Sequence, residues 1–98
     1  MRLTKKEIEA IKEAFLEVFE NGKIYLFGSR VDDSKRGGDI DLFIDLDRKL
    51  DIKEKMRLKS RFRLLLYDKI GEQKIDIIIS KDKNKSIEQE ALKTGVLL

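Results

Sequence analysis

The chain has 98 residues and a mass of 11.5 kDa, which is enough for one domain with a modest core, expected to span residues 1–98. Cysteine and histidine are both absent. Their absence excludes disulfides, thiolate metal sites and catalytic triads that contain histidine. Any bound metal must therefore have oxygen ligands, which the hard ions magnesium and manganese prefer.

Charged residues make up 42% of the chain, with 22 Lys and Arg against 19 Asp and Glu and a net charge of +3. This near balance is spread along the sequence, whereas a dedicated DNA-binding domain clusters its basic residues, so we expect no direct DNA binding. No apolar run approaches the length of a membrane span, and no signal peptide is recognisable. These features predict a soluble, cytoplasmic protein that does not associate with membranes.

The first predicted element is an amphipathic helix over about residues 5–20. Thr4 and Glu7 have the spacing of a capping box, and the apolar residues that follow recur at helical spacing. Asn21 and Gly22 then supply a stop signal. Residues 23–27 are rich in β-forming types and predict a short strand.

Residues 28–38 contain three glycines and five charged residues, and they predict a loop. Residues 39–46 alternate strictly between apolar and mostly acidic positions, which predicts a strand. One face of that strand carries Ile40, Leu42, Ile44 and Leu46, and the other carries Asp39, Asp41, Phe43 and Asp45.

A second helix is predicted from Asp51 to about Ile70, and its expected buried side consists of Met56, Leu58, Phe62, Leu65, Leu66 and Ile70. Residues 74–80 predict a third strand, and residues 86–94 a short last helix. The apolar tail 96–98 is long enough to add a few further strand residues. This order predicts an α/β (α+β) domain in which the helices pack on one face of a small mixed sheet.

Acidic residues interrupt two of the predicted strands. Asp39 and Asp41 are two residues apart, so their carboxylates share a face and can hold one ion or bridge two. Asp76 lies within the otherwise apolar run KIDIIIS, where burial of its charge would need a basic partner or a metal ion. If the third strand lies beside the second, the three carboxylates form a magnesium site in outline. The alternative is that they simply mark the solvent-exposed face of an edge strand.

Gly28 and Ser29 directly follow the first predicted strand. Glycine permits a tight exit and a close approach of the backbone to a ligand, and free amides there can hold an anion. Arg30, Lys35 and Arg36 in the same loop can meet phosphate oxygens. The alternative interpretation is a plain turn followed by a solvated run of charges.

Taken together, Phe27-Gly28-Ser29, a nine-residue gap and then Asp39-Ile40-Asp41-Leu42 resemble the signature of the polymerase β-type nucleotidyltransferases. The chain looks most like the minimal members of that superfamily, and the resemblance covers nearly all of it. The resemblance implies that Asp39, Asp41 and Asp76 are the catalytic and metal-binding residues, with two Mg²⁺ ions that Mn²⁺ can replace. It also implies that Gly28, Ser29, Arg30, Lys35 and Arg36 bind ATP. The loop departs from the usual pattern, because Asp32 and Asp33 stand where a second basic residue is common.

The resemblance further implies a partner. Minimal nucleotidyltransferases often pair with a helical HEPN-type protein in a toxin–antitoxin system, in which the nucleotidyltransferase acts as the antitoxin and transfers AMP to a tyrosine of the toxin. We therefore expect a hetero-oligomer. Two alternatives remain open at this point: a non-catalytic subunit that neutralises or scaffolds such a partner, and nucleotidyl transfer to a small molecule or an RNA end. Phe43 and the apolar residues 96–98 are candidates for the docking surface.

Overall fold

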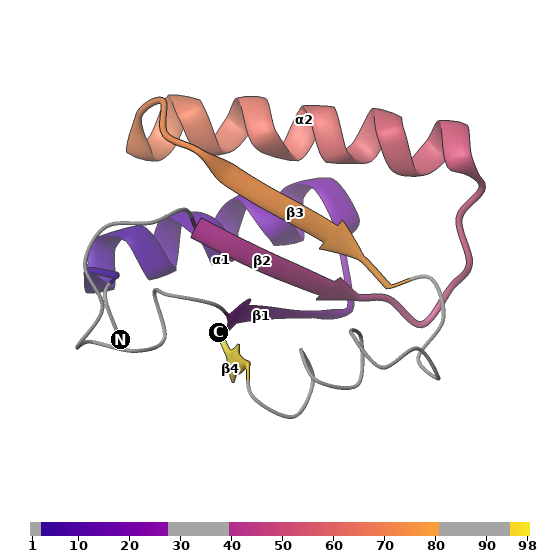
Figure 1. Ribbon diagram of the computed structural model, residues 1–98, viewed down its shortest axis with the longest axis horizontal. Helices are drawn as coiled ribbons and strands as arrows, with labels where there is room; N and C mark the ends of the chain where they lie inside the picture. Colours follow the sequence, from indigo (N-terminus) through magenta and orange to yellow (C-terminus); the bar gives the residue numbers. More distant parts are fainter. Residues whose placement is uncertain (1–2, 28–39, 81–94) are drawn as a thin grey trace.

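The computed structural model describes residues 3–27, 40–80 and 95–98. The described elements are, in chain order, α1 (Lys5–Phe19), β1 (Lys23–Phe27), β2 (Ile40–Asp45), α2 (Ile52–Ile70), β3 (Ile75–Ile79) and β4 (Val96–Leu97) (Figure 1).

The four strands form one mixed sheet in the order β3-β2-β1-β4. β1 pairs antiparallel with β2 on one side and with β4 on the other, whereas β2 and β3 are parallel. Parallel neighbours need a long crossover connection, and α2 supplies it between β2 and β3 (Figure 1).

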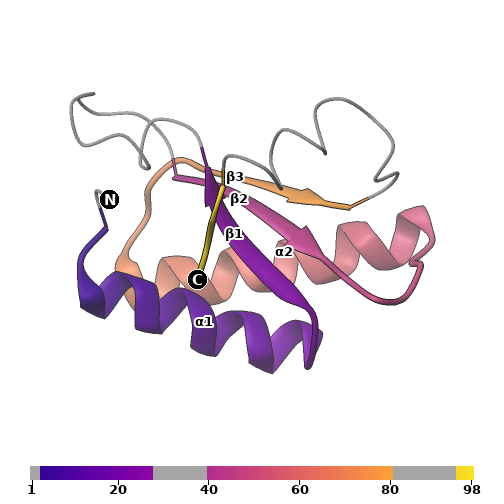
Figure 2. The same ribbon diagram turned by 90° about the horizontal axis from the view of Figure 1, so that it is seen from below.

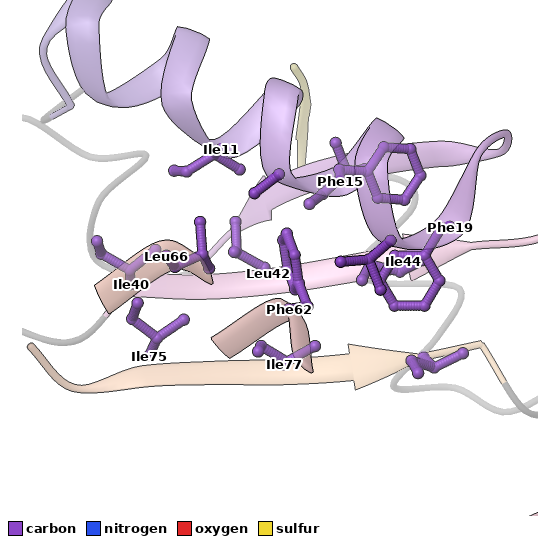
Figure 3. Close-up of a cluster of buried hydrophobic side chains, with 14 of the residues drawn as sticks. Ile11, Phe15, Phe19, Ile40, Leu42, Ile44, Phe62, Leu66, Ile75 and Ile77 are labelled. Atoms are coloured by element: carbon purple, nitrogen blue, oxygen red, sulfur yellow. The ribbon is translucent and has the colours of Figure 1, made fainter. Parts of the chain in front are cut away.

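Both helices lie on the same side of the sheet, as Figure 2 shows. The hydrophobic core fills the space between the helices and the sheet (Figure 3), and aromatic rings of the two helices are in contact there. Phe19 of α1 meets Phe62 of α2 edge to face, with ring centroids 5.6 Å apart. β2 contributes the alternating apolar residues Ile40, Leu42 and Ile44, each of them fully buried.

Local signals determine where the helices begin and end. At the start of α1 the Thr4 hydroxyl accepts from the Glu7 amide, and the Glu7 carboxylate accepts from the Thr4 amide, each at 3.1 Å. Asp51 caps α2 by accepting from the amide of Glu54 at 2.8 Å. Gly22, which has φ +113°, follows α1 at a tightly packed position, where an added Cβ would lie 2.8 Å from the carbonyl oxygen of Asp45.

Most of the predicted elements are confirmed, with ends that differ by one or two residues. The capping box, the alternation in β2, the position of β3 beside β2 and the strand in the tail are all as expected. The loop 28–38 and the helix 86–94 lie outside the described residues. No helix in the described ranges is long and apolar enough to cross a membrane.

Met56 was predicted to be buried, and this prediction was wrong, because its exposed fraction is 64%. The buried stripe of α2 consists of Leu58, Phe62 and Leu66, which are spaced four residues apart. Met56 precedes Leu58 by two residues, or about 200° around the helix axis, so it lies away from that stripe.

Candidate functional site

A row of residues crosses three neighbouring strands at one end of the sheet. Phe27 of β1 is paired with Asp41 of β2, and Asp41 is paired with Asp76 of β3. Residues that are paired in register project to the same face, and neighbouring strands are about 4.8 Å apart. The sheet therefore brings the carboxylates of Asp41 and Asp76 next to each other, as predicted for adjacent strands.

This acidic row lies on the sheet face opposite the helices. Ile40 and Leu42, on either side of Asp41, point into the core between sheet and helices, so Asp41 points the other way. Asp41 is half-buried and Asp76 is exposed. The prediction that the charge of Asp76 is buried and must be compensated was therefore wrong, because the side chain is exposed and neither of the two described helices covers this face of β3 (Figure 2).

A second row on the same face is apolar. Tyr25, Phe43 and Ile78 occupy the register positions next to Phe27, Asp41 and Asp76. The rings of Tyr25 and Phe43 lie 6.4 Å apart, and Phe43 is fully buried although it does not belong to the core between sheet and helices. Phe43 is therefore no part of an exposed docking surface, which corrects one of the two docking candidates.

The contact between Tyr25 and Phe43 was missed in the sequence. The alternation in residues 23–27 places Tyr25 and Phe27 on one face, but only the strand register shows which residues of β2 they meet. As a result, the acidic row is bordered by a buried aromatic side chain, and water is excluded from that part of the face.

The remaining predicted site residues lie outside the described residues: Gly28, Ser29, Arg30, Lys35, Arg36 and Asp39. Their roles stay predictions. Phe27 immediately precedes Gly28, and Ile40 immediately follows Asp39. The amide of Ile40 donates to the carbonyl of Lys74 at 3.1 Å, which holds the start of β2 beside the start of β3.

The described carboxylates have the chemistry that a magnesium ion requires. Asp41 and Asp76 offer oxygen ligands on one face, and the chain contains neither His nor Cys to favour a softer metal. Within the described ranges no group of three acidic residues is close enough to form a metal site. The pair therefore fits as part of a magnesium site, and the predicted third ligand, Asp39, lies outside those ranges.

Comparison with known proteins agrees with this arrangement. A family model described as "Polymerase beta, Nucleotidyltransferase" matches residues 9–98. No curated protein matches the chain. The family match confirms the resemblance to the polymerase β-type superfamily, and the mixed sheet with helices on one face is consistent with the fold of that superfamily.

Proposed function

Because this chain belongs to the polymerase β nucleotidyltransferase family, we propose that it transfers AMP from ATP to a hydroxyl group of a partner protein. Domains of this family generally use a nucleotide substrate and a divalent metal ion. The observation that carries the proposal is the pairing of Asp41 with Asp76 on adjacent parallel strands, in the same row as the last residue before Gly28.

In the proposed reaction the acceptor oxygen attacks the α-phosphorus of ATP. A new O–P bond forms while the bond from the α-phosphorus to its bridging oxygen breaks, and pyrophosphate leaves with that oxygen. The proton of the acceptor passes to a carboxylate, and Asp76 is the candidate base because its exposed side chain is accessible to the acceptor.

Asp41 and Asp76 would hold the metal, together with Asp39. A divalent ion bound there supplies the positive charge that offsets the phosphates and activates the acceptor hydroxyl. The residues Gly28, Ser29, Arg30, Lys35 and Arg36 would bind the triphosphate. The protein's own contribution is to position these groups, and the buried Phe43 beside the row supports a fixed position for Asp41.

The proposed acceptor is a tyrosine of a helical HEPN-type protein, with this chain acting as the antitoxin of the pair. The likeness to minimal nucleotidyltransferases along nearly the whole chain supports this choice. It is tested by incubating the protein with ATP, magnesium and a HEPN-type protein encoded beside it, and measuring the intact mass of the partner.

We expect one or more AMP units on a partner tyrosine. Asp41→Asn abolishes the adduct and leaves the complex intact, whereas Asp47→Asn, at an exposed aspartate just beyond β2, leaves it unchanged. If wild-type protein binds ATP and the partner but the mass of the partner stays the same, the chain is a binding subunit. Label appearing on an added RNA or small molecule instead would assign the acceptor to that class.

A further inference from the structure

β3 is the outermost strand at one side of the described sheet. The amide of Ile40 donates to the carbonyl of Lys74, and the amide of Ser80 donates to the carbonyl of Ile44. In a parallel ladder, every second residue directs its backbone N–H and C=O groups to the neighbouring strand. The backbone groups of the even-numbered residues of β3 therefore point to β2, and those of the odd-numbered residues point outward. Arg63 of α2 donates to the outward carbonyl of Ile75 at 3.2 Å. The backbone groups of Ile77 and Ile79 therefore point to the outer edge.

Among the described residues, Asp76 and Arg63 are the charged groups at this edge, and the segment Ile77–Ile79 carries none of the features that protect natural edge strands. The sequence of β3 is IDIII, without Pro or Lys, and positive φ angles, which often mark a bulge, do not occur in it. A largely apolar edge of this kind pairs readily with another strand. We therefore expect a functional partner to cover it.

A groove runs between this edge and the N-terminal half of α2. Its volume is about 260 Å³, and its lining consists of Ile52, Lys55, Met56, Lys59, Ile77, Ile78 and Ile79. Ile52 and Met56 are large apolar side chains with exposed fractions of 77% and 64%. The groove thus combines an apolar wall, an outward-facing strand edge and two lysines.

The charge of α2 indicates the chemistry of the occupant. The helix contains seven basic and two acidic residues, a net charge of +5. The whole chain has a net charge of +3, so the rest of the molecule is slightly negative. A basic helix beside a strand edge favours an acidic, extended polypeptide, because the edge offers backbone hydrogen bonds and the lysines offer opposite charge.

We propose that an acidic extended segment of the partner protein adds as a strand to the edge of β3 and places its acceptor hydroxyl beside Asp76. The inference rests on the proposed function and specifies how its acceptor is presented. In an added strand, the residue opposite Asp76 projects to the same face with its Cβ about 5 Å away. A tyrosine at that position lies directly at the acidic row.

The test measures binding of a fluorescein-labelled peptide, EIEYEIE, to the full chain by anisotropy in the absence of ATP. We expect EIEYEIE to bind and its basic counterpart KIKYKIK to bind at least about tenfold more weakly. Binding weakens with added salt, because salt screens the attraction between the peptide carboxylates and the groove lysines. On peptide addition, the amides of Ile77 and Ile79 become protected from hydrogen exchange.

Two charge-reversal variants locate the site. The first double variant, Lys55→Glu with Lys59→Glu, reverses both charges in the groove. The control double variant, Lys53→Glu with Arg61→Glu, makes the same change in net charge at exposed positions of α2 outside the groove. We expect the first pair to weaken EIEYEIE binding about tenfold or more and the second pair to change it less than about threefold. Circular dichroism confirms that both variants are folded.

Equal binding of the acidic and basic peptides, or equal binding by the two variants, would overturn the proposal. So would amides of Ile77 and Ile79 that are already protected in the free protein. A single-stranded RNA dodecamer that binds through Lys55 and Lys59 while the peptide does not would assign the groove to nucleic acid instead.

These outcomes are separable from the proposed function. Peptide binding without any AMP transfer to a partner would contradict the proposed enzyme activity and would still support docking at the edge of β3. AMP transfer to a partner that is equally efficient in the groove variant and the wild type would contradict only the proposed docking at the edge of β3.

Discussion

Asp76 and Phe43 each lie in an environment that their residue types alone do not predict. Asp76 interrupts an apolar strand but is exposed, whereas Phe43 stands between two aspartates and is fully buried. Both are on the sheet face opposite the helices, where one end carries the acidic row and the middle packs against Tyr25. A carboxylate that keeps contact with water avoids most of the cost of desolvation, and so remains available to bind a cation.

Phe43→Ala is expected to lower the free energy of unfolding by about 3–5 kcal/mol, which is typical of removing a fully buried ring. Urea denaturation measures the change. Leu64→Ala serves as the control, because Leu64 is 68% exposed and its truncation should cost less than about 0.5 kcal/mol. A loss below about 1 kcal/mol for Phe43→Ala would show that this face is open to water at its centre.

At the scale of elements, α2 connects the two strands that carry the site and packs against α1. Its buried stripe of Leu58, Phe62 and Leu66 faces the core, and Lys69 forms an ion pair with Glu13 of α1 at 3.5 Å. That ion pair is exposed and contributes little, so the position of α2 depends on its apolar stripe. Its start is capped by Asp51, which accepts a hydrogen bond from the amide of Glu54.

Asp51→Ala is expected to lower the free energy of unfolding by about 1 kcal/mol, because it leaves the amide of Glu54 without its capping acceptor. Asp51→Ser retains a capping oxygen and should restore most of the loss. Urea denaturation of the three proteins measures the difference. If the serine variant were as unstable as the alanine variant, the contribution of Asp51 would not come from the cap.

At the scale of the whole molecule, the site requires the complete β2-α2-β3 unit. Asp41 and Asp76 are far apart in the sequence and become neighbours only when β3 aligns with β2 in parallel. A metal ion that bridges them therefore binds the folded chain and not the unfolded one. Such a ligand stabilises the fold by mass action.

Magnesium or manganese should raise the melting temperature of the wild-type protein. At a tenfold excess over Kd the stabilisation is about 1.4 kcal/mol, or roughly 6–11 °C for a domain of this size. Asp76→Asn should remove the response and change the metal-free stability by less than about 0.5 kcal/mol, because Asp76 is exposed.

Differential scanning fluorimetry with and without the metal measures this effect. Asp47→Asn, at an exposed aspartate outside the acidic row, should keep the full response. If Asp76→Asn responds to magnesium as the wild type does, the metal binds elsewhere and Asp76 is not a ligand.

The sequence by itself determined the features that depend on near neighbours. The capping residues Thr4 and Asp51, the alternation in β2 and the apolar stripe of α2 follow from interactions within one or two turns or along one strand. They are confirmed, except that Met56 lies outside the stripe. The signature around Gly28 and Asp41 also indicated the superfamily, which the family match over residues 9–98 confirms.

Only the tertiary structure decided which distant residues meet. The sequence allowed β3 to lie beside β2, but the parallel register is what pairs Asp76 with Asp41. Likewise, the burial of Phe43 and the outward edge of β3 depend on how separate elements pack. Strand order and coverage of a face are set by contacts between segments remote in sequence, and no local periodicity encodes them.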